Sequence, residues 1–569
     1  MKVWKIIEEA VKAALEELGR IHGVDLSNQV PVVEIPKFEN QGDFATPVAL
    51  SLARHLRRPP IQIAEELKSL LSLPQGLFDN VEVARPGYIN FFVSFDAYFN
   101  NLEAVLKDVK GFMRSDVGGG RRVLLEFVSA NPTGPLHVGH ARGAIYGDAL
   151  ARVMRTAGYA VDTEYYVNDR GNQISMLGLS VYARGRELLG LKADFPENGY
   201  KGTYIRDLAK VLLKELGEEV FKRDYEALGP SDATPIARGA MLRLLEEIKA
   251  DLSRLGITFD SFFHERSLYE PHNKVQEAID FLSANGLIYK DETGALLFKA
   301  TDFGDTQDRV VVRSNGQPTY FASDIAYHAD KLSRGYDTLI NIWGADHHGY
   351  IPRMKGAISA LGHDPEILEV LLVQMVSLVK GGQPVTMGKR SGDYYTLADL
   401  VEEVGSDAVR FIFLTRKPDA HMDFDVDLAR SASMENPVYY VQYGHARLRS
   451  ILSKAGLDTN SLEFMSELGM ELKYPEEQSI VKRIVLFPYT IEQAAVTRQV
   501  HLLSFSLIDL VKQFHSYYTK YKGTDKVLAE DPRVRQARLI MSGALAEVLK
   551  EGLELLGVSA PQRMSRDEG

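Results

Sequence analysis

The stretch Ser129-Ala-Asn-Pro-Thr-Gly-Pro-Leu-His137-Val-Gly-His140 is the centre of the chain's predicted architecture. An apolar run over residues 123–128 precedes it and predicts a strand buried on both faces, because such strands carry unbroken apolar runs. The prolines and glycines of the stretch predict a tight loop after that strand. Apolar residues at helical spacing follow, and they predict a helix from His137 to about Ala157.

The two histidines fall on one face of the first turn of that helix. A helix N-terminus presents unpaired N–H groups and a partial positive charge, so it binds phosphate when it follows a parallel strand. Gly139 lets a nucleotide approach the backbone closely. By spacing alone, an ordinary polar first turn or a pair of metal ligands would explain the histidines equally well, so the flanking residues must decide.

This stretch resembles the HIGH signature of class I aminoacyl-tRNA synthetases, written here His137-Val-Gly-His140. The longer string, from Ser129 to the residues after His140, resembles the arginyl-tRNA synthetases. The resemblance implies that His137, Gly139 and His140 bind ATP and that the two histidines stabilise the charge developing at its α-phosphate. It also places Asp346 and His347, which end a predicted strand, beside the nucleotide.

A second ATP-binding segment is implied by Thr386-Met-Gly-Lys-Arg-Ser-Gly392, which is similar to the KMSKS loop of the family. Lys389 stands at the second lysine of that loop and is expected to act in catalysis, with Met387 beside ATP. Thr386 replaces the first lysine, so a different cation must take its place. Lys380 and Arg390 are the candidates.

The resemblance further implies an arginine site that contains acids. A guanidinium offers a planar fork of N–H donors to a carboxylate, and lysine cannot satisfy the same acid. Asp324, with Tyr320 four residues earlier on one helical face, matches the family's guanidinium site, and Glu126 is a second acid there. An acid in so apolar a strand is costly unless paired, which independently supports a role in function. Ser129 and Asn131 are expected to hold the α-amino and carboxylate groups.

The 569 residues are enough for three or four domains, and their composition, 45% hydrophobic and 25% charged, is that of a soluble protein. The chain has no cysteine, which excludes disulfides and cysteine-ligated metal sites and suits the cytoplasm. The first residues do not form a secretory signal, and the most apolar run, residues 370–379, is too short to span a bilayer. We therefore expect a cytoplasmic protein without a membrane partner.

The pattern predicts a multidomain fold of α/β and all-α parts. Residues 1–115 predict a small α/β domain, and residues 121–420 predict a doubly wound parallel-sheet (Rossmann-like) catalytic domain with a helical insertion at about 175–300. Residues 430–569 predict an α-helical domain. The resemblance implies that the first domain contacts tRNA and the last binds the anticodon. Without the resemblance, the first could be a stabilising appendage.

Tyr439, Tyr443 and Arg447 fall on one predicted helix of the last domain and are the candidate tRNA contacts, because aromatic and arginine side chains stack on exposed RNA bases. On pattern alone they could equally be core aromatics with a solvated arginine. The net charge of −11 argues mildly against nucleic acid, but residues 430–569 are nearly balanced in charge. They are therefore the better candidate to bind a polyanion.

Taken together, the sequence predicts a monomeric arginine–tRNA ligase whose partners are arginine, ATP and an arginine-accepting tRNA. Mg²⁺ is expected only with ATP. Zinc is not expected, because adjacent His347 and His348 diverge and no HExxH motif is present. The alternatives are an inactive RNA-binding paralogue, which the altered lysine loop would favour, and a small-molecule adenylating enzyme, which would not need the helical C-terminal part. Within the class, the cysteinyl and glutamyl enzymes are the nearest rivals.

Overall fold

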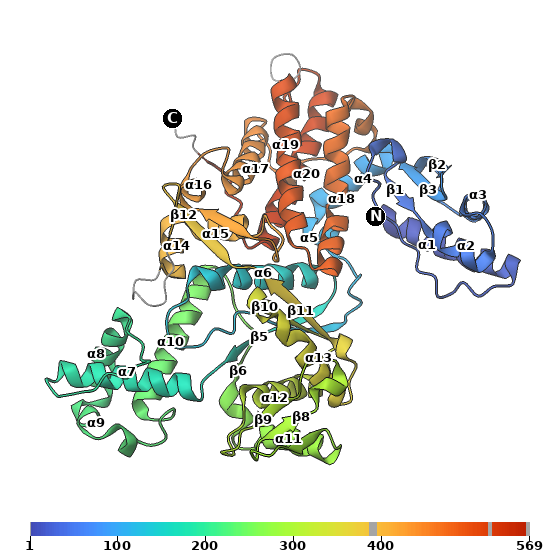
Figure 1. Cartoon of the computed structure of the whole chain (residues 1–569). Helices are drawn as coiled ribbons and strands as arrows, with labels where there is room; N and C mark the ends of the chain where they lie inside the picture. The colour runs from blue at the N-terminus through green and yellow to red at the C-terminus, as the bar shows by residue number, and fades with distance from the viewer. Residues whose placement is uncertain (1, 386–394, 522–525, 565–569) are drawn as a thin grey trace.

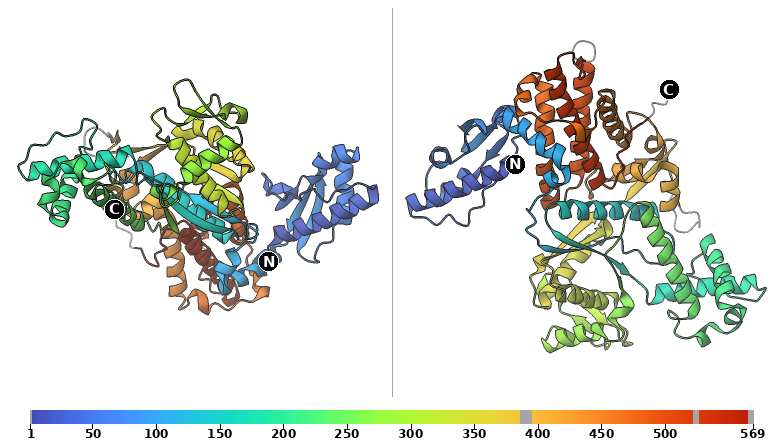
Figure 2. Two further views of the ribbon diagram at one scale, coloured as in Figure 1. Left: turned by 90° about the horizontal axis from the view of Figure 1, so that it is seen from below. Right: turned by 180° about the vertical axis from the view of Figure 1, so that it is seen from behind.

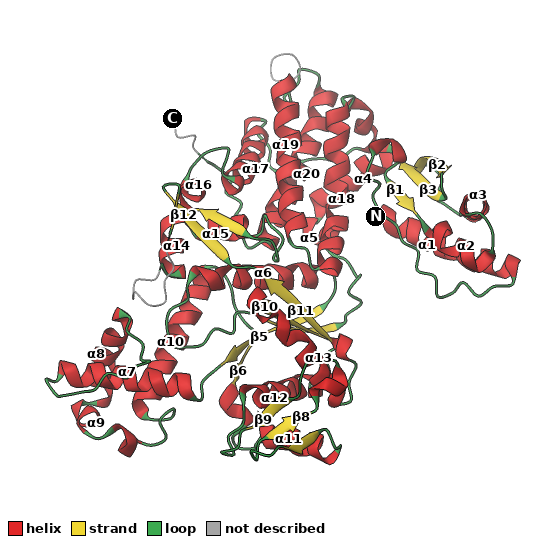
Figure 3. Cartoon of the chain, in the orientation of Figure 1, coloured by secondary structure: helices red, strands yellow, loops and turns green. Residues whose placement is uncertain are grey.

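The computed structural model describes residues 2–385, 395–521 and 526–564. Three parts follow one another in Figure 1: an N-terminal domain at one side, a catalytic domain with a central sheet, and a C-terminal bundle of helices above it. The N-terminal domain stands out from the rest in both views of Figure 2. Figure 3 shows that the C-terminal part is almost entirely helical, as the sequence predicts.

The N-terminal domain packs helices against a small antiparallel sheet of order β1-β3-β2. Its first helix buries Val3, Ile7, Val11 and Leu18, spaced as one helical face requires. Before this sheet, Glu34 forms a single antiparallel bridge with Ala45. The elements are α1 (Val3–His22), β1 (Phe44–Thr46), α2 (Val48–Leu56), α3 (Pro60–Leu70), β2 (Phe78–Ala84) and β3 (Tyr88–Val93).

The catalytic domain is built on a five-stranded parallel sheet of order β11-β10-β4-β5-β6. The chain runs outward from β4 in one direction and returns on its other side with β10, so the strand order reverses between β4 and β10. A doubly wound sheet binds its ligands at that point. The strands are β4 (Arg122–Glu126), β5 (Ala160–Val167), β6 (Ser261–His264), β10 (Thr338–Gly344) and β11 (Leu368–Val373).

Helices cover both faces of this sheet. Val123 and Leu125 of β4 belong to the core that includes α6 (Val138–Thr156). Leu124 belongs instead to the core formed with α12 (Tyr320–Ser333) and α13 (Ile351–Ala360). This alternation is the side-chain period of a strand buried on both faces, and it explains why the predicted strand reads as one continuous apolar run.

The predicted insertion at about 175–300 differs from what the structure shows, because β6 returns to the central sheet in its middle. Before β6, four helices form a hydrophobic core of their own. After β6 comes a small antiparallel sheet of order β7-β8-β9, which is separate from the central sheet. With four half-buried residues, β6 is too short to give a periodic signal. These elements are α7 (Asn172–Leu188), α8 (Thr203–Leu216), α9 (Glu218–Lys222), α10 (Pro235–Arg254), α11 (Lys274–Ala284), β7 (Ile288–Lys290), β8 (Leu296–Phe298) and β9 (Arg309–Val312).

The apolar run over residues 370–379 is divided between two sheets. Its first part is β11, and its second is β12, which pairs with β13 and β14. An unbroken apolar run does not show where a strand leaves one sheet for another. The elements that join the catalytic domain to the C-terminal bundle are β12 (Val376–Lys380), β13 (Gln383–Pro384), α14 (Leu397–Val404), α15 (Ser406–Phe413), β14 (Met422–Asp425) and α16 (Val426–Arg430).

The C-terminal bundle also receives the helices that follow the N-terminal sheet. Both of those helices pack against α18 and α20. The side chain of Trp4 joins the same contact, since its Nε1 donates to Oε2 of Glu492 at 2.8 Å. The helices concerned are α4 (Phe95–Lys107), α5 (Val109–Met113), α17 (Pro437–Lys454), α18 (Pro475–Thr497), α19 (His501–Tyr521) and α20 (Pro532–Leu555).

One buried guanidinium joins three parts of the molecule. Arg410 of α15 is fully buried and pairs with Asp148 of α6 at 2.5 Å. It also donates to the backbone oxygens of Leu255 and Leu556 at 2.7 and 2.8 Å. Those carbonyls lie just beyond α10 and α20, where helix carbonyls lack intrahelical partners. A Cβ on Gly557 would lie 2.3 Å from this guanidinium, so only glycine fits there.

We expect Arg410→Met to destabilise the protein strongly, by about 3–5 kcal/mol, because it leaves the carboxylate of Asp148 and two helix ends without their buried partner. The thermal unfolding midpoint would show this. Arg206→Met, which removes an exposed guanidinium on α8, is the matched control and should leave the midpoint unchanged. Equal midpoints for the two variants would contradict the role assigned to Arg410.

Candidate active site

The first turn of α6 is capped by the two histidines of the sequence motif. His137 is the N-cap, and its Nδ1 accepts a hydrogen bond from the backbone N–H of Gly139 at 3.1 Å. Nδ1 of His140 accepts from the backbone N–H of His137 at 3.3 Å, which completes a capping box. The two rings stack with centroids 3.8 Å apart. Because both Nδ1 atoms accept, each neutral ring carries its proton on Nε2, so Nε2–H is its donor.

Gly139 is required by this arrangement, since a Cβ there would lie 2.8 Å from the ring of His137. A pocket of about 360 Å³ opens beside the histidines, between the loop before α6 and the helical insertion. Tyr204 of α8 closes one side, and its hydroxyl donates to the backbone oxygen of Thr133 at 2.8 Å. The lining residues are Ala130, Asn131, Thr133, Gly134, Pro135, Leu136, His137, His140, Gln173, Tyr200 and Tyr204.

Residues shortly after the KMSKS-like stretch lie next to these histidines. Thr396 forms an antiparallel bridge with His137, and Leu397 N–H donates to the backbone oxygen of Leu136 at 2.8 Å. Met387, Lys389, Thr386 and Arg390 themselves lie outside the described residues. Lys380, proposed above as a replacement cation, pairs with Glu403 at 2.7 Å.

Asp324, the predicted guanidinium acceptor, lies on the second turn of α12 and accepts a hydrogen bond from the hydroxyl of Tyr350. Burial raises the pKa of its carboxyl to about 6. Tyr320 begins the same helix one turn earlier, and 53% of its surface is exposed. Its side chain is therefore accessible to a ligand that reaches Asp324.

Glu265 is a second acid at this site, and the sequence analysis missed it. It follows β6 directly and is buried, and its Oε2 has no hydrogen-bond partner among the described residues. Burial raises its pKa to about 7, and the charges of Asp324 and Asp169 add to that shift. A buried carboxylate oxygen with no partner is costly, so it points to a ligand that donates there. Its signal was hidden because the strand before it was not recognised.

Glu126 ends β4, and it already has a charged partner within the chain. Lys331 of α12 donates to its Oε2 at 2.5 Å, so the cost of burying this acid is met without a substrate. Its Oε1 accepts from the hydroxyl of Ser129 at 2.9 Å. Ser129 and Val128 have positive φ angles of 42° and 68°, which turn the chain sharply at the end of the strand. The side-chain oxygen of Asn131 accepts a hydrogen bond of 2.9 Å from a side-chain amide in the loop that follows β5.

Asp346 and His347 lie in a 3-10 turn (Ala345–Tyr350) directly after β10, at the same edge of the sheet. Both side chains are largely exposed, and they lie 3.7 Å apart. This edge adjoins the loop that follows β4, because β4 and β10 are paired. The residues predicted to bind phosphate, nucleotide and arginine thus lie near the edge of the sheet where the strand order reverses. The KMSKS-like loop is not included, because it lies outside the described residues.

The predicted tRNA contacts gather on α17. The rings of Tyr439 and Tyr443 are nearly parallel, with centroids 6.0 Å apart, and the guanidinium of Arg447 lies 4.2 Å above the ring of Tyr518. Tyr443 and Arg447 line a groove of about 1080 Å³ with several further basic side chains. Stacked, partly exposed rings next to arginines can bind RNA bases.

Within residues 2–385, 395–521 and 526–564, no three His, Asp or Glu side chains are grouped so that they could hold a metal ion. No helix in the described part of the chain is long and apolar enough to cross a membrane.

Three family models match successive parts of the chain. Residues 5–93 match the arginyl tRNA synthetase N terminal domain, and residues 102–427 match the catalytic domain described as tRNA synthetases class I (R). Residues 441–564 match the DALR anticodon binding domain.

Known proteins resemble the chain over nearly its whole length. It is 45% identical over 544 residues to an arginine–tRNA ligase of Citrifermentans bemidjiense, covering 95% of this chain and 97% of the relative. It is 44% identical to an arginine–tRNA ligase of Desulfosudis oleivorans, covering 98% and 99%. Among solved structures, the arginyl-tRNA synthetase of Thermus thermophilus is similar with a TM-score of 0.75 and 25% identity, covering 98% of this chain and 100% of that one.

Proposed function

The chain belongs to the arginyl-tRNA synthetase family, and from that premise we propose how its residues divide the work. It is an arginine–tRNA ligase: it activates arginine with ATP and transfers it to tRNA. The assignment of roles to single residues is our proposal. It is carried by one observation, the two carboxyls with raised pKa, Asp324 and Glu265, at the sheet edge that also bears the capped terminus of α6.

In the first step, a carboxylate oxygen of arginine attacks the α-phosphorus of MgATP. A new O–P bond forms, the bond to the leaving pyrophosphate breaks, and arginyl-adenylate results. The Nε2–H groups of His137 and His140 donate to the phosphates as charge builds up, and we assign Lys389 the same task because it matches the second lysine of the KMSKS loop. Phosphoryl transfer needs positioning and charge stabilisation more than covalent help from the protein.

Arginine is held by its two ends. Its guanidinium donates to Asp324 and to the unpartnered Oε2 of Glu265, with Tyr320 along its stem. Its α-amino group faces Glu126 and Ser129, and Asn131 contacts its carboxylate. Lysine would leave part of this acceptor set unpaired in a dry site, which is the basis of rejection.

We expect arginine to bind more weakly as the pH falls through the pKa values of these acids. The pKa of Asp324 is raised to about 6 and that of Glu265 to about 7, so both become neutral below that range and lose their attraction for the guanidinium. The value of kcat/KM for arginine, measured between about pH 8 and pH 5.5, should fall on the acid side. The KM for ATP serves as the control. A flat profile for arginine would argue against charged acceptors.

In the second step, a ribose hydroxyl of the tRNA terminus attacks the carbonyl carbon of arginyl-adenylate and AMP leaves. We assign tRNA contacts to the N-terminal domain and to Tyr439, Tyr443 and Arg447 of the anticodon-binding bundle, with domains near residues 1–115, 121–420 and 430–569. We further propose that the enzyme is a monomer in the cytoplasm. Mg²⁺ enters only with ATP, and zinc is not used.

Exchange of labelled pyrophosphate into ATP tests these proposals, with each amino acid in turn and with or without tRNA. We expect exchange with arginine only, and only when tRNA is present. Exchange without tRNA at the same rate would contradict the tRNA requirement. Absence of exchange under every condition would favour an RNA-binding paralogue, and Thr386→Lys would then test whether the altered loop is the cause.

A further inference from the structure

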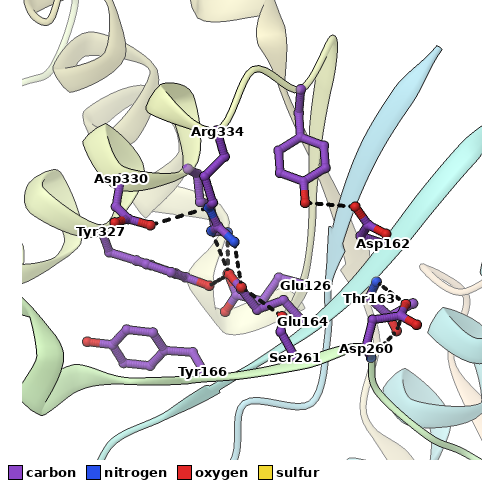
Figure 4. A network of polar contacts seen from close by, with 12 residues as sticks. Glu126, Asp162, Thr163, Glu164, Tyr166, Asp260, Ser261, Tyr327, Asp330 and Arg334 are labelled. Atoms are coloured by element: carbon purple, nitrogen blue, oxygen red, sulfur yellow. Dashed lines mark hydrogen bonds and ion pairs between the residues drawn. The ribbon is translucent and has the colours of Figure 1, made fainter.

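A row of polar side chains crosses the central sheet under the end of α12 (Figure 4). At one level of the neighbouring strands β10, β4, β5 and β6 stand Asn341, Glu126, Glu164 and Ser261. Side chains at matching positions of parallel strands point to the same face. Two residues before Glu126 and Asn341 on this face stand the apolar Leu124 and Leu339, and the exposed Asp162 stands two residues before Glu164. We call the row of four the polar stripe.

Lys331 in the last turn of α12 and Arg334, the residue that caps its C-terminus, pair with the two acids of the stripe. Lys331 is fully buried and donates to Glu126 at 2.5 Å. Arg334, three residues later, donates to both oxygens of Glu164 at 2.7 and 2.8 Å, and Figure 4 shows this fork. Each pair offsets the cost of burying its charges. Together the pairs fix the position of α12 along the sheet.

Lys331 also begins a chain of hydrogen bonds that leads to Asp324. Its Nζ donates to Oδ1 of Asn341 at 2.9 Å, and Nδ2 of Asn341 lies 3.1 Å from Nε2 of His328. Nδ1 of His328 lies 2.8 Å from the backbone oxygen of Asp324. The amide must donate and the carbonyl must accept, so His328 is neutral with its proton on Nδ1. Burial lowers the pKa of His328 to about 3, in agreement.

We propose that Lys331 is a positioning residue that sets both ends of the arginine pocket. It orients Glu126 directly, and it orients the helical turn that carries Asp324 through Asn341 and His328. Being fully buried, it acts on the substrate only through these groups. The inference rests on the arginine site proposed above.

Arg334 provides a matched comparison. It caps the C-terminus of the same helix and makes the same kind of pair on the same stripe, but its partner Glu164 is not among the residues assigned to the arginine pocket. If Lys331 served only to anchor α12, loss of either cation would have the same effect on catalysis. If it positions the pocket, only its loss should change the response to arginine.

The test compares Lys331→Met with Arg334→Met by pyrophosphate exchange in the presence of tRNA. For Lys331→Met we expect the KM for arginine to rise by about tenfold to 10²-fold, with little change in the KM for ATP, because small displacements of binding groups have effects of this size. Arg334→Met should lower the thermal midpoint but leave the KM for arginine unchanged. Equal effects of the two variants on that KM would overturn the proposal.

Lys331→Met leaves the charge of Glu126 buried alone, so the fold itself could fail. Glu126→Gln combined with Lys331→Met removes both charges and should recover the midpoint while the KM for arginine stays raised. A normal KM for arginine in this folded double variant would overturn the proposal. Asp324→Asn separates a failure of the proposed arginine site from a failure of the role proposed for Lys331. If Asp324→Asn does not raise the KM for arginine, the site is wrong, whatever the effect of Lys331→Met.

The acid limb of kcat/KM for arginine reports whether Asp324 is close enough to Lys331 for its carboxyl to respond to that charge. The positive charge of Lys331 lowers the pKa of Asp324, so its removal should shift the limb to higher pH. Loss of the Glu126 charge shifts the limb the other way, so the double variant is compared with Glu126→Gln alone. A limb at the same pH in these two variants would count against Lys331. The other groups that face Asp324 remain in all variants: Tyr350, Arg353, Tyr166 and Glu265.

Discussion

Asp324→Asn should lower kcat/KM for arginine by about 10³-fold, because removing one member of a buried charge pair leaves the other unpaired at a cost of about 2–5 kcal/mol. Asparagine keeps the shape of the side chain and the oxygen that accepts from Tyr350. It replaces the second oxygen with an NH₂ group that cannot accept from a guanidinium. The loss should therefore appear in arginine recognition and leave the fold and the ATP site unchanged.

Steady-state exchange kinetics at saturating tRNA would measure this effect, with the KM for arginine and for ATP determined separately. Asp302→Asn is the matched control, since that carboxylate is exposed in another part of the catalytic domain. The control should behave as the unaltered enzyme. If Asp324→Asn kept its arginine kinetics within about threefold, the guanidinium would have to be held elsewhere, with Glu265 as the next residue to change.

The parts of the active site that are contiguous in sequence could be predicted from it. The loop from Ser129 to His140 carries its whole signal locally: an apolar run, turn residues and a helical period. The predicted strand and helix agree with β4 and α6 to within two residues at each end. The helical character of the C-terminal part is confirmed for the same reason, since its periodic segments are long.

The groups that meet only through register could not be predicted. Glu164 and Ser261 face Glu126 because β5 and β6 pair with β4 at one level, and nothing near Glu126 in the sequence encodes that level. The unusual position of an acid in an apolar strand was noticed, but its partner, Lys331, lies 205 residues away. Glu265 was missed because the short β6 gave no signal.

Domain limits raise a related problem. Residues 95–113 follow the N-terminal sheet in sequence, and a boundary near 115 assigns them to it. In space, α4 and α5 pack against α18 and α20 of the C-terminal bundle. Their apolar faces give the helical period but not the identity of the surface they cover. The division of the chain into domains thus depends on long-range packing that a single sequence does not show.

The second large effect is expected at His140, where two functions of one ring can be separated. Nδ1 accepts from the backbone N–H of His137 and caps α6, whereas Nε2–H is the donor proposed for the ATP phosphates. Asparagine places an acceptor near Nδ1 and nothing near Nε2. Glutamine places an amide donor near Nε2. The two substitutions therefore remove different halves of the ring.

We expect His140→Asn to lower kcat for adenylate formation by about 10²–10³-fold, the usual loss when one preorganised donor to a developing charge is removed. Its thermal midpoint should stay close to that of the unaltered enzyme, because the cap is kept. His140→Gln should recover part of the rate. Single-turnover formation of arginyl-adenylate would measure the step itself. If His140→Asn formed arginyl-adenylate at the rate of the unaltered enzyme, the histidine would serve the helix cap alone, and the phosphates would depend on His137 and on the loop that contains Lys389.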